Sequence, residues 1–270
     1  MSKSRGNVVT PMHLLDEYSA DGVRYWAAGA RLGTDTAFDD KVFKIGKRLV
    51  TKLFNAGKFV LGQGAPDGHI ARELDRAFVT RLRALVAHVT ASLDEFDFAH
   101  ALQETETFFW NDFTDTYIEL TKARAREQDP SAVAALRLGL GVLLRLFAPV
   151  LPYITEEVWS WSNTGSIHAA RWPSADELAA VPAPADPASF DVAVACLAAI
   201  NKSKSEAGVS VGRGVTRLTL AAGPASIARL DAVSADVMAA ARVKAYDVRT
   251  DGALDGAFQV VGLELEPLEA

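Results

Sequence analysis

The sequence has a single cysteine, Cys196, which lies in the apolar run 192–198. A lone thiol cannot form an internal disulfide, and no ligating side chains surround it, so we interpret it as a small buried side chain rather than a nucleophile. The five histidines are scattered without the spacing of metal ligands, and we predict no metal site. The chain also lacks a glycine-rich phosphate loop and the nucleophilic serine turn of hydrolases.

Long apolar runs are missing too. No run reaches the ~20 residues that a membrane helix needs, and the amino terminus lacks the pattern of a secretory signal. Together with the scarcity of cysteine, this predicts a cytoplasmic protein without a membrane partner. Hydrophobic residues make up 49% of the chain and charged residues 23%, which is typical of a packed core.

Positive charge is scarce overall but concentrated in one place. The formal net charge of −6 argues against indiscriminate binding to nucleic acid, and we expect no DNA partner. Residues 41–66 contain no Asp or Glu but six Lys or Arg, whereas residues 94–119 contain eight carboxylates and no Lys or Arg. An acidic chain with one basic stretch can present a local positive face to phosphates.

Helical periodicity dominates the first two thirds of the chain. Asp39 and Asp40 suit the start of a helix that runs to about Leu61, and its predicted apolar face consists of Val42, Ile45, Leu49, Leu53, Ala56 and Val60. Further helices are predicted over residues 21–28, 73–93, 98–126 and 131–147, with a short one from Pro152. Long helices joined by short polar loops indicate a bundle.

The composition changes after Pro173. Three prolines between residues 181 and 187 indicate a linker over 176–188. Beyond it we predict helices over 189–207 and 225–241, and strands near 215–220, 245–248 and 258–263. The predicted fold class is mainly α, a helical bundle followed by a small α/β unit. The predicted domains are 1–36, 37–175 and 189–270.

The basic stretch supplies the best candidate binding site. One face of the predicted helix carries a row of cations with an amide and a terminal aromatic, namely Lys41, Lys44, Arg48, Lys52, Asn55 and Phe59. Such a row suits single-stranded RNA, because the charges meet phosphates and the aromatic ring stacks on an unpaired base. The alternative is a solvated basic face with Phe59 packed on a neighbouring helix.

The acidic, aromatic run 108–119 is a weaker candidate. Asp112, Asp115 and Glu119 share a face at helical spacing. Without histidine or cysteine partners, salt bridges between helices are a better interpretation than a metal site.

Several segments together resemble one family. Met1-Ser2-Lys3-Ser4 resembles the MSKS part of the KMSKS loop of class I aminoacyl-tRNA synthetases. Segments similar to the valyl, isoleucyl and leucyl enzymes follow in order at 20–26, 54–60, 109–122, 148–159, 166–168 and 171–173. Residues 32–36 and 207–210 favour the valyl-tRNA synthetases, and the resemblance extends to about residue 265.

The resemblance implies a function. In this family the KMSKS lysine acts in amino-acid activation, so Lys3 is the expected catalytic residue, and Ser2, Lys3 and Ser4 are expected to contact ATP. ATP and Mg²⁺ would serve the full-length enzyme, and none is expected in this chain alone. Lys41, Lys52 and Phe59 match positions where the anticodon loop of a valine-specific tRNA docks.

Two features of the family are missing from the sequence, the amino-terminal catalytic half with its HIGH signature and the editing domain. We therefore expect this chain to bind tRNA without catalysing the reaction alone. The alternatives are the same region of an isoleucyl-tRNA synthetase, a free-standing RNA-binding paralogue, and a structural bundle that docks another protein.

Overall fold

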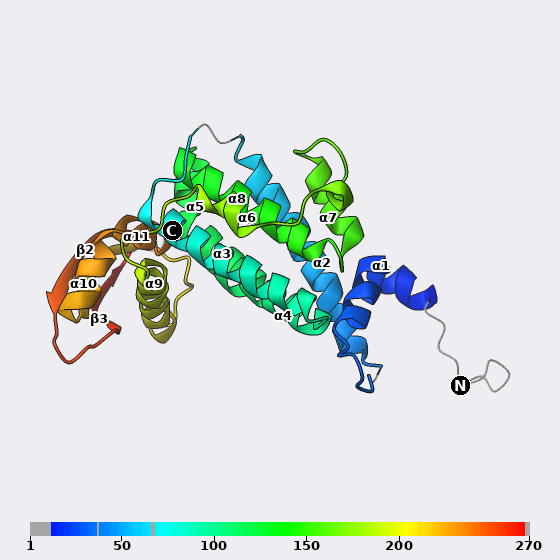
Figure 1. Cartoon of the computed structure of the whole chain (residues 1–270). Coiled ribbons are helices and arrows are strands. Elements are labelled where there is room, and N and C mark those ends of the chain that lie inside the picture. Colours follow the sequence, from blue (N-terminus) through cyan, green and yellow to red (C-terminus); the bar gives the residue numbers. More distant parts are fainter. Residues whose placement is uncertain (1–11, 37, 66–67, 268–270) are drawn as a thin grey trace. The chain divides into compact units, whose positions relative to one another are not determined.

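The computed structural model describes residues 12–36, 38–65 and 68–267, and helices dominate it (Figure 1). The first helix, α1 (Met12–Ala28), begins well before the predicted helix at 21–28 and is kinked at Ser19, where φ is 68°. The second, α2 (Asp40–Gly62), has the predicted bounds. Asp39 Oδ1 accepts a hydrogen bond of 2.9 Å from Lys41 N, which satisfies one of the amides left open at a helix start.

The next helices also lie where the sequence places them. They are α3 (Glu73–Asp94), α6 (Pro130–Phe147) and α7 (Pro152–Ser160). The predicted helix 98–126 is divided into α4 (Phe98–Thr107), the π-helical segment η2 (Phe108–Tyr117) and α5 (Ile118–Arg126). Phe98 is 42% exposed, since it lies at the first turn of α4.

Helix α6 is the most apolar of them. Within the described part of the chain it is the one helix long and apolar enough to cross a membrane, judged by length and composition, and 67% of it is buried. A core helix meets the same criteria, and α6 contributes to the core the fully buried side chains of Leu136, Leu143 and Phe147.

The chain packs into two compact units, and several helices contribute to both. The first unit comprises residues 1–62, 84–109 and 138–177, and the second comprises residues 63–83, 110–137 and 178–270. In the first, Phe43 stacks on Tyr18 and Trp26 with ring centroids 5.6 and 5.3 Å away. In the second, Phe78 stacks on Tyr117 at 3.9 Å.

The carboxyl-terminal residues form the α/β unit. Its elements are α9 (Ser189–Glu206), β1 (Val215–Ala222), α10 (Pro224–Asp231), α11 (Ser234–Ala240), β2 (Val243–Thr250) and β3 (Phe258–Leu265). The sheet has the order β2-β1-β3, with β1 parallel to β2 and antiparallel to β3. The predicted helix 225–241 is two helices, because the chain leaves helical geometry at Val233. The predicted fold class is confirmed.

The proline-rich segment before α9 is anchored by its backbone. It begins with the short helix α8 (Ala175–Ala179). Farther along, the Glu73 carboxylate accepts hydrogen bonds from Ala185 N, Asp186 N and Ser189 Oγ at 2.8 to 2.9 Å. Burial alone would raise the pKa of Glu73, but these bonds outweigh it, and the pKa lies below 4.5.

Candidate nucleic-acid interface

Helix α2 carries all six residues of the predicted row within the described part of the chain. Lys41, Lys44, Arg48 and Asn55 are exposed, whereas Lys52 and Phe59 are half-buried. We call these six residues the α2 cation row. The row therefore remains a candidate surface, and Phe59 is only partly available for stacking.

The buried face of α2 differs from the predicted one at its start. Val42 and Ile45 are half-buried, and Phe43 and Gly46 are buried in their place. The reason is α1, which packs against the first turns of α2 and takes the Phe43 ring into its aromatic stack. From Leu49 onward the predicted face is correct.

The cations of the row are not equivalent. Lys44 Nζ lies 2.7 Å from the Asp40 carboxylate, and this pairing raises the pKa of Lys44 and lowers the pKa of Asp40. Lys41 and Arg48, by contrast, make no side-chain hydrogen bond or ion pair with any described residue. Their full charge is available to an anionic ligand.

Two glycines set how closely the neighbouring helices approach α2. A Cβ on Gly46 would lie 2.9 Å from the Tyr25 ring of α1, and a Cβ on Gly57 would lie 2.5 Å from Val158 Cγ1 of α7. Real Cβ atoms do not approach so closely, so both contacts require glycine. Helix α2 is therefore held by α1 and α7 on its packed side, and Figure 1 shows α7 beside it.

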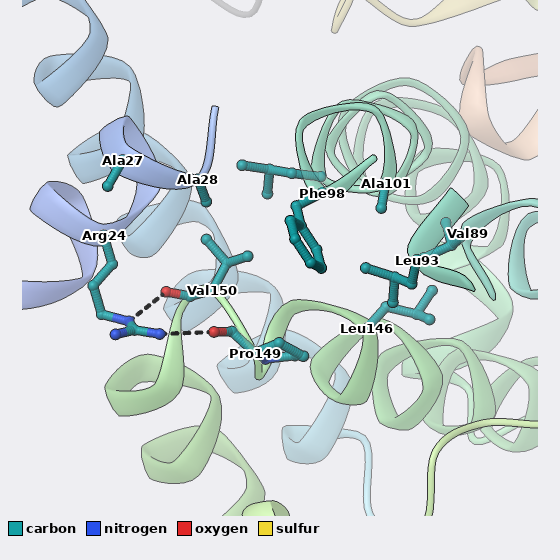
Figure 2. Close-up of a pocket in the computed structure, with 11 residues that line it drawn as sticks. Arg24, Ala27, Ala28, Val89, Leu93, Phe98, Ala101, Leu146, Pro149 and Val150 are labelled. Carbon is teal, nitrogen blue, oxygen red and sulfur yellow. Dashed lines mark hydrogen bonds between the residues drawn. The ribbon is translucent and has the colours of Figure 1, made fainter. Parts of the chain in front are cut away.

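Helix α1 also fixes the turn between α6 and α7. The Asp21 carboxylate accepts hydrogen bonds from Tyr153 N and Ile154 N at 3.2 and 2.7 Å, which caps the amino terminus of α7. Burial raises the pKa of Asp21 despite these bonds. Arg24 donates to Pro149 O and Val150 O at 2.8 and 3.0 Å (Figure 2). We call these contacts of Asp21 and Arg24 the α1 clamp. The sequence predicted a helix over 21–28 but did not predict these contacts.

An apolar pocket lies beside the clamp. Its volume is about 400 Å³, and Phe98, Leu93 and Leu146 contribute to its lining, with the Phe98 ring directed into it (Figure 2). Arg24 also lines it, and its Nε and one terminal nitrogen donate to the backbone carbonyls of Val150 and Pro149.

The acidic run forms one salt bridge of the predicted kind, between helices, and one within a helix. Asp112 pairs with Arg81 at 2.9 Å across two helices, and Glu119 pairs with Lys122 along the same helix. Among the described residues, no group of three or more His, Cys, Asp or Glu side chains could hold a metal ion.

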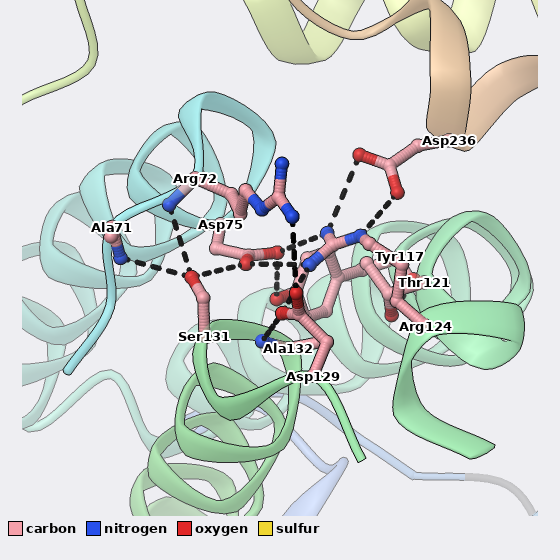
Figure 3. A network of polar contacts seen from close by, with 10 residues as sticks. All are labelled: Ala71, Arg72, Asp75, Tyr117, Thr121, Arg124, Asp129, Ser131, Ala132 and Asp236. Carbon is pink, nitrogen blue, oxygen red and sulfur yellow. Dashed lines mark hydrogen bonds and ion pairs between the residues drawn. The ribbon is translucent and has the colours of Figure 1, made fainter. Parts of the chain in front are cut away.

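A buried ionic network in the second unit was missed by sequence reasoning (Figure 3). Asp75 is 0% exposed and accepts hydrogen bonds from Tyr117 Oη, Ser131 Oγ and both terminal nitrogens of Arg124 at 2.6 to 3.1 Å. Arg124 also pairs with Asp129 and Asp236. Burial lowers the pKa of Arg124, but Asp75 and Asp236 more than compensate, so the pKa is raised. Every member is engaged within the fold, which indicates a structural role.

Ser2, Lys3 and Ser4, the residues predicted to contact ATP, lie outside the described residues. The structure therefore gives no geometry for them.

Comparison with known proteins agrees with the helical architecture. The model of the anticodon-binding domain of tRNA ligases matches residues 75–217, more than half of the chain. The chain belongs to the family of anticodon-binding domains of tRNA ligases. The α2 cation row lies before the matched residues, so the match to this anticodon-binding family does not itself test the row.

Relatives extend the comparison to the whole chain. A valine–tRNA ligase of Thermobifida fusca is 46% identical over 100% of this chain, and one of Leifsonia xyli subsp. xyli is 51% identical over 66% of it. The chain spans 31% and 22% of the length of these two relatives. It matches the carboxyl-terminal portion of valine–tRNA ligases.

One solved structure has a related fold. It is the leucyl-tRNA synthetase in the ternary complex of Agrobacterium radiobacter K84 agnB2 LeuRS-tRNA-LeuAMS, with a TM-score of 0.51, 24% identity and coverage of 68% of this chain and 23% of that one. At this identity the likeness concerns the fold alone.

Proposed function

We propose that this chain binds the anticodon region of a valine-specific tRNA through the α2 cation row, as part of a valine–tRNA ligase. The observation that carries the proposal is the exposure of Lys41 and Arg48, two cations without an internal partner among the described residues, in a chain of an anticodon-binding family. Phosphates of an unpaired loop supply the charge that such cations lack.

The reaction of the whole enzyme would join valine to its tRNA with ATP and Mg²⁺. Support comes from the relatives, which are named valine–tRNA ligases. Lys3 with Ser2 and Ser4 would contribute to ATP handling there, together with a nucleotide-binding half that this sequence does not contain. The chain alone is expected to bind RNA and to show no valine-dependent exchange of pyrophosphate into ATP.

The test uses a hairpin RNA with the anticodon stem and loop of a valine tRNA. Lys41→Ala and Arg48→Ala should weaken its binding, and each should reduce the slope of log K against log salt by about 0.7, the value for one phosphate contact in a single strand. Lys202→Ala is the matched control, because Lys202 is a cation with 76% exposure on another helix, α9.

Phe59 needs a separate measurement, because it is half-buried. If it stacks on a base, Phe59→Ala should weaken binding with little change in salt slope and should reduce the preference for a valine anticodon. If it only packs, the melting temperature should fall while the affinity of the folded protein stays constant. Binding by all three α2 variants at the parental affinity in low salt would overturn the proposed interface.

A further inference from the structure

An aromatic pair lies where α7 meets α2, beside the cation row. The rings of Phe54 on α2 and Trp161 at the end of α7 meet edge to face, with centroids 5.2 Å apart and an interplanar angle of 81°. Trp161 remains 38% exposed, so part of its ring meets solvent. Gly57 lets α7 approach α2 at this point, since a Cβ there would lie 2.5 Å from Val158 Cγ1 and 3.4 Å from Trp161 Cζ3.

The indole is held in one orientation. Trp161 Nε1 donates a hydrogen bond of 3.1 Å to Glu157 Oε1, and Phe54 packs against the ring. A fixed aromatic surface loses little conformational entropy when a ligand stacks on it. This surface is therefore preorganised for a flat partner.

A cation accompanies the pair. Lys58 Nζ lies 4.9 Å above the centre of the Phe54 ring, and Lys58 is exposed. On α7, Glu157 Oε1 accepts the indole N–H, and Glu156 accepts hydrogen bonds of 2.9 Å from Ser166 Oγ and Ile167 N. None of these donors carries a charge, so both carboxylates remain anionic, and Lys58 supplies the positive charge beside the rings.

The location connects these residues with the cation row. Asn55 and Lys58 stand three residues apart on α2 and are neighbours on its surface, and Asn55 belongs to the row. No carboxylate lies in the sequence from residue 41 to residue 66. A flexible anionic strand that follows the row would reach the rings without meeting a like charge on α2.

We propose that Phe54, Lys58 and Trp161 form a second RNA contact, the α2–α7 platform, where an unpaired base of the bound loop stacks on the Trp161 indole and Lys58 meets the adjoining phosphate. Aromatic surfaces paired with cations are how single-stranded nucleic acid is held without a specific base edge. The platform rests on the proposed function, because it extends the contact of the same loop from α2 to α7.

The experiment measures binding of the same anticodon hairpin to the full 270-residue chain by fluorescence anisotropy. Trp161→Ala should raise Kd at least about five-fold, the lower end of the range for loss of one stacked base, without changing the salt slope. Trp161→Phe should restore most of the affinity, whereas Trp161→Leu, which keeps apolar packing on Phe54, should not. Tyr153→Ala is the matched control, since Tyr153 is an aromatic on the same helix with 67% exposure.

A second set of hairpins identifies the stacked base. In each, one loop nucleotide is replaced by an abasic residue. The hairpin that lacks the stacked base should bind the parent chain and Trp161→Leu with equal affinity, because the base that contacts the indole is gone. Every other abasic hairpin should still bind the parent more tightly. A loss that is the same for every abasic hairpin would show that the indole acts through the fold, and it would overturn the platform.

The outcomes separate the platform from the proposed function. Parental affinity in Trp161→Ala and Trp161→Leu, combined with weakened binding in Lys41→Ala, would overturn the platform and leave the α2 cation row intact. This result would instead favour a protein partner for the exposed Trp161 ring. Failure of the parent chain to bind the hairpin at low salt would overturn both.

Discussion

The buried network around Asp75 yields the sharpest prediction about stability. Asp75→Asn keeps the shape of the side chain but replaces one carboxylate oxygen with an amide donor. The two oxygens of Asp75 accept from Tyr117, Ser131 and Arg124, all of which donate to it. An amide nitrogen at either position would face a donor, so at least one buried hydrogen bond is lost and the charge of Arg124 loses a partner.

The size of the loss in the free energy of unfolding depends on which partners Arg124 keeps. Removing one partner of a buried ion pair costs about 3–5 kcal/mol, and a buried unsatisfied donor costs about 1–3 kcal/mol. Arg124 keeps Asp129 and Asp236, which limits the loss of Coulomb energy. The expected decrease in the free energy of unfolding is therefore about 3 kcal/mol, near the lower end of the range for a broken pair.

Urea unfolding followed by circular dichroism measures this decrease. Asp247→Asn is the matched control, because Asp247 also pairs with an arginine, Arg217 at 2.7 Å, but both side chains are more than half exposed. Its unfolding midpoint should stay close to that of the parent, since exposed pairs contribute little. A decrease below about 1 kcal/mol for Asp75→Asn would refute the reasoning, because it would mean that the four bonds to Asp75 are not made in solution.

Three further predictions concern single sites. Gly57→Ala should lower the melting temperature, because the new Cβ would lie 2.5 Å from Val158 Cγ1; an unchanged midpoint would show that α7 moves away freely. Because the pKa of Glu73 is lowered in the folded chain, its stabilisation is present above pH 4.5 and is lost as the pH falls through the folded value. Glu73→Gln should therefore flatten the loss of stability below that pH, and parallel acid curves would contradict this. Burial raises the pKa of Cys196 to about 12, so a thiol reagent should label it only on unfolding, and rapid labelling of native protein would show an open site.

The predictable part of the fold is the part that local chemistry fixes. The bounds of α2 follow from Asp39 and Asp40 at its start and from the glycines that end it, and the structure agrees within a residue or so. The π-helical segment η2 escaped prediction, because its apolar residues fit an α-helical face about as well as a π-helical one over ten residues. The length of α1 was underestimated for a different reason. Its first half precedes a kink at Ser19, and the kink breaks the helical periodicity of the apolar residues.

The candidate site was predictable only on one helix. Periodicity places the α2 cation row on a single face and allows the i,i+4 pair of Asp40 and Lys44, but it cannot show that Lys41 and Arg48 lack a partner among the described residues. The partner of Phe54 lies more than a hundred residues away at Trp161, and no spacing rule relates the two. Such contacts depend on which helices become neighbours, so they need the tertiary structure.

The packing of α2 explains why affinity and stability should separate on this helix. Gly46 and Gly57 lie about three turns apart and admit α1 and α7 against the same side. Lys41 and Arg48 project from another side, where no described residue pairs with them, so their removal should cost RNA affinity and leave the melting temperature unchanged. A substitution at Gly57 displaces α7 together with the Trp161 ring, so it should cost both. If Gly57→Ala lowered stability but bound the hairpin like the parent, the position of α7 would not matter to RNA, and the interface would be confined to α2.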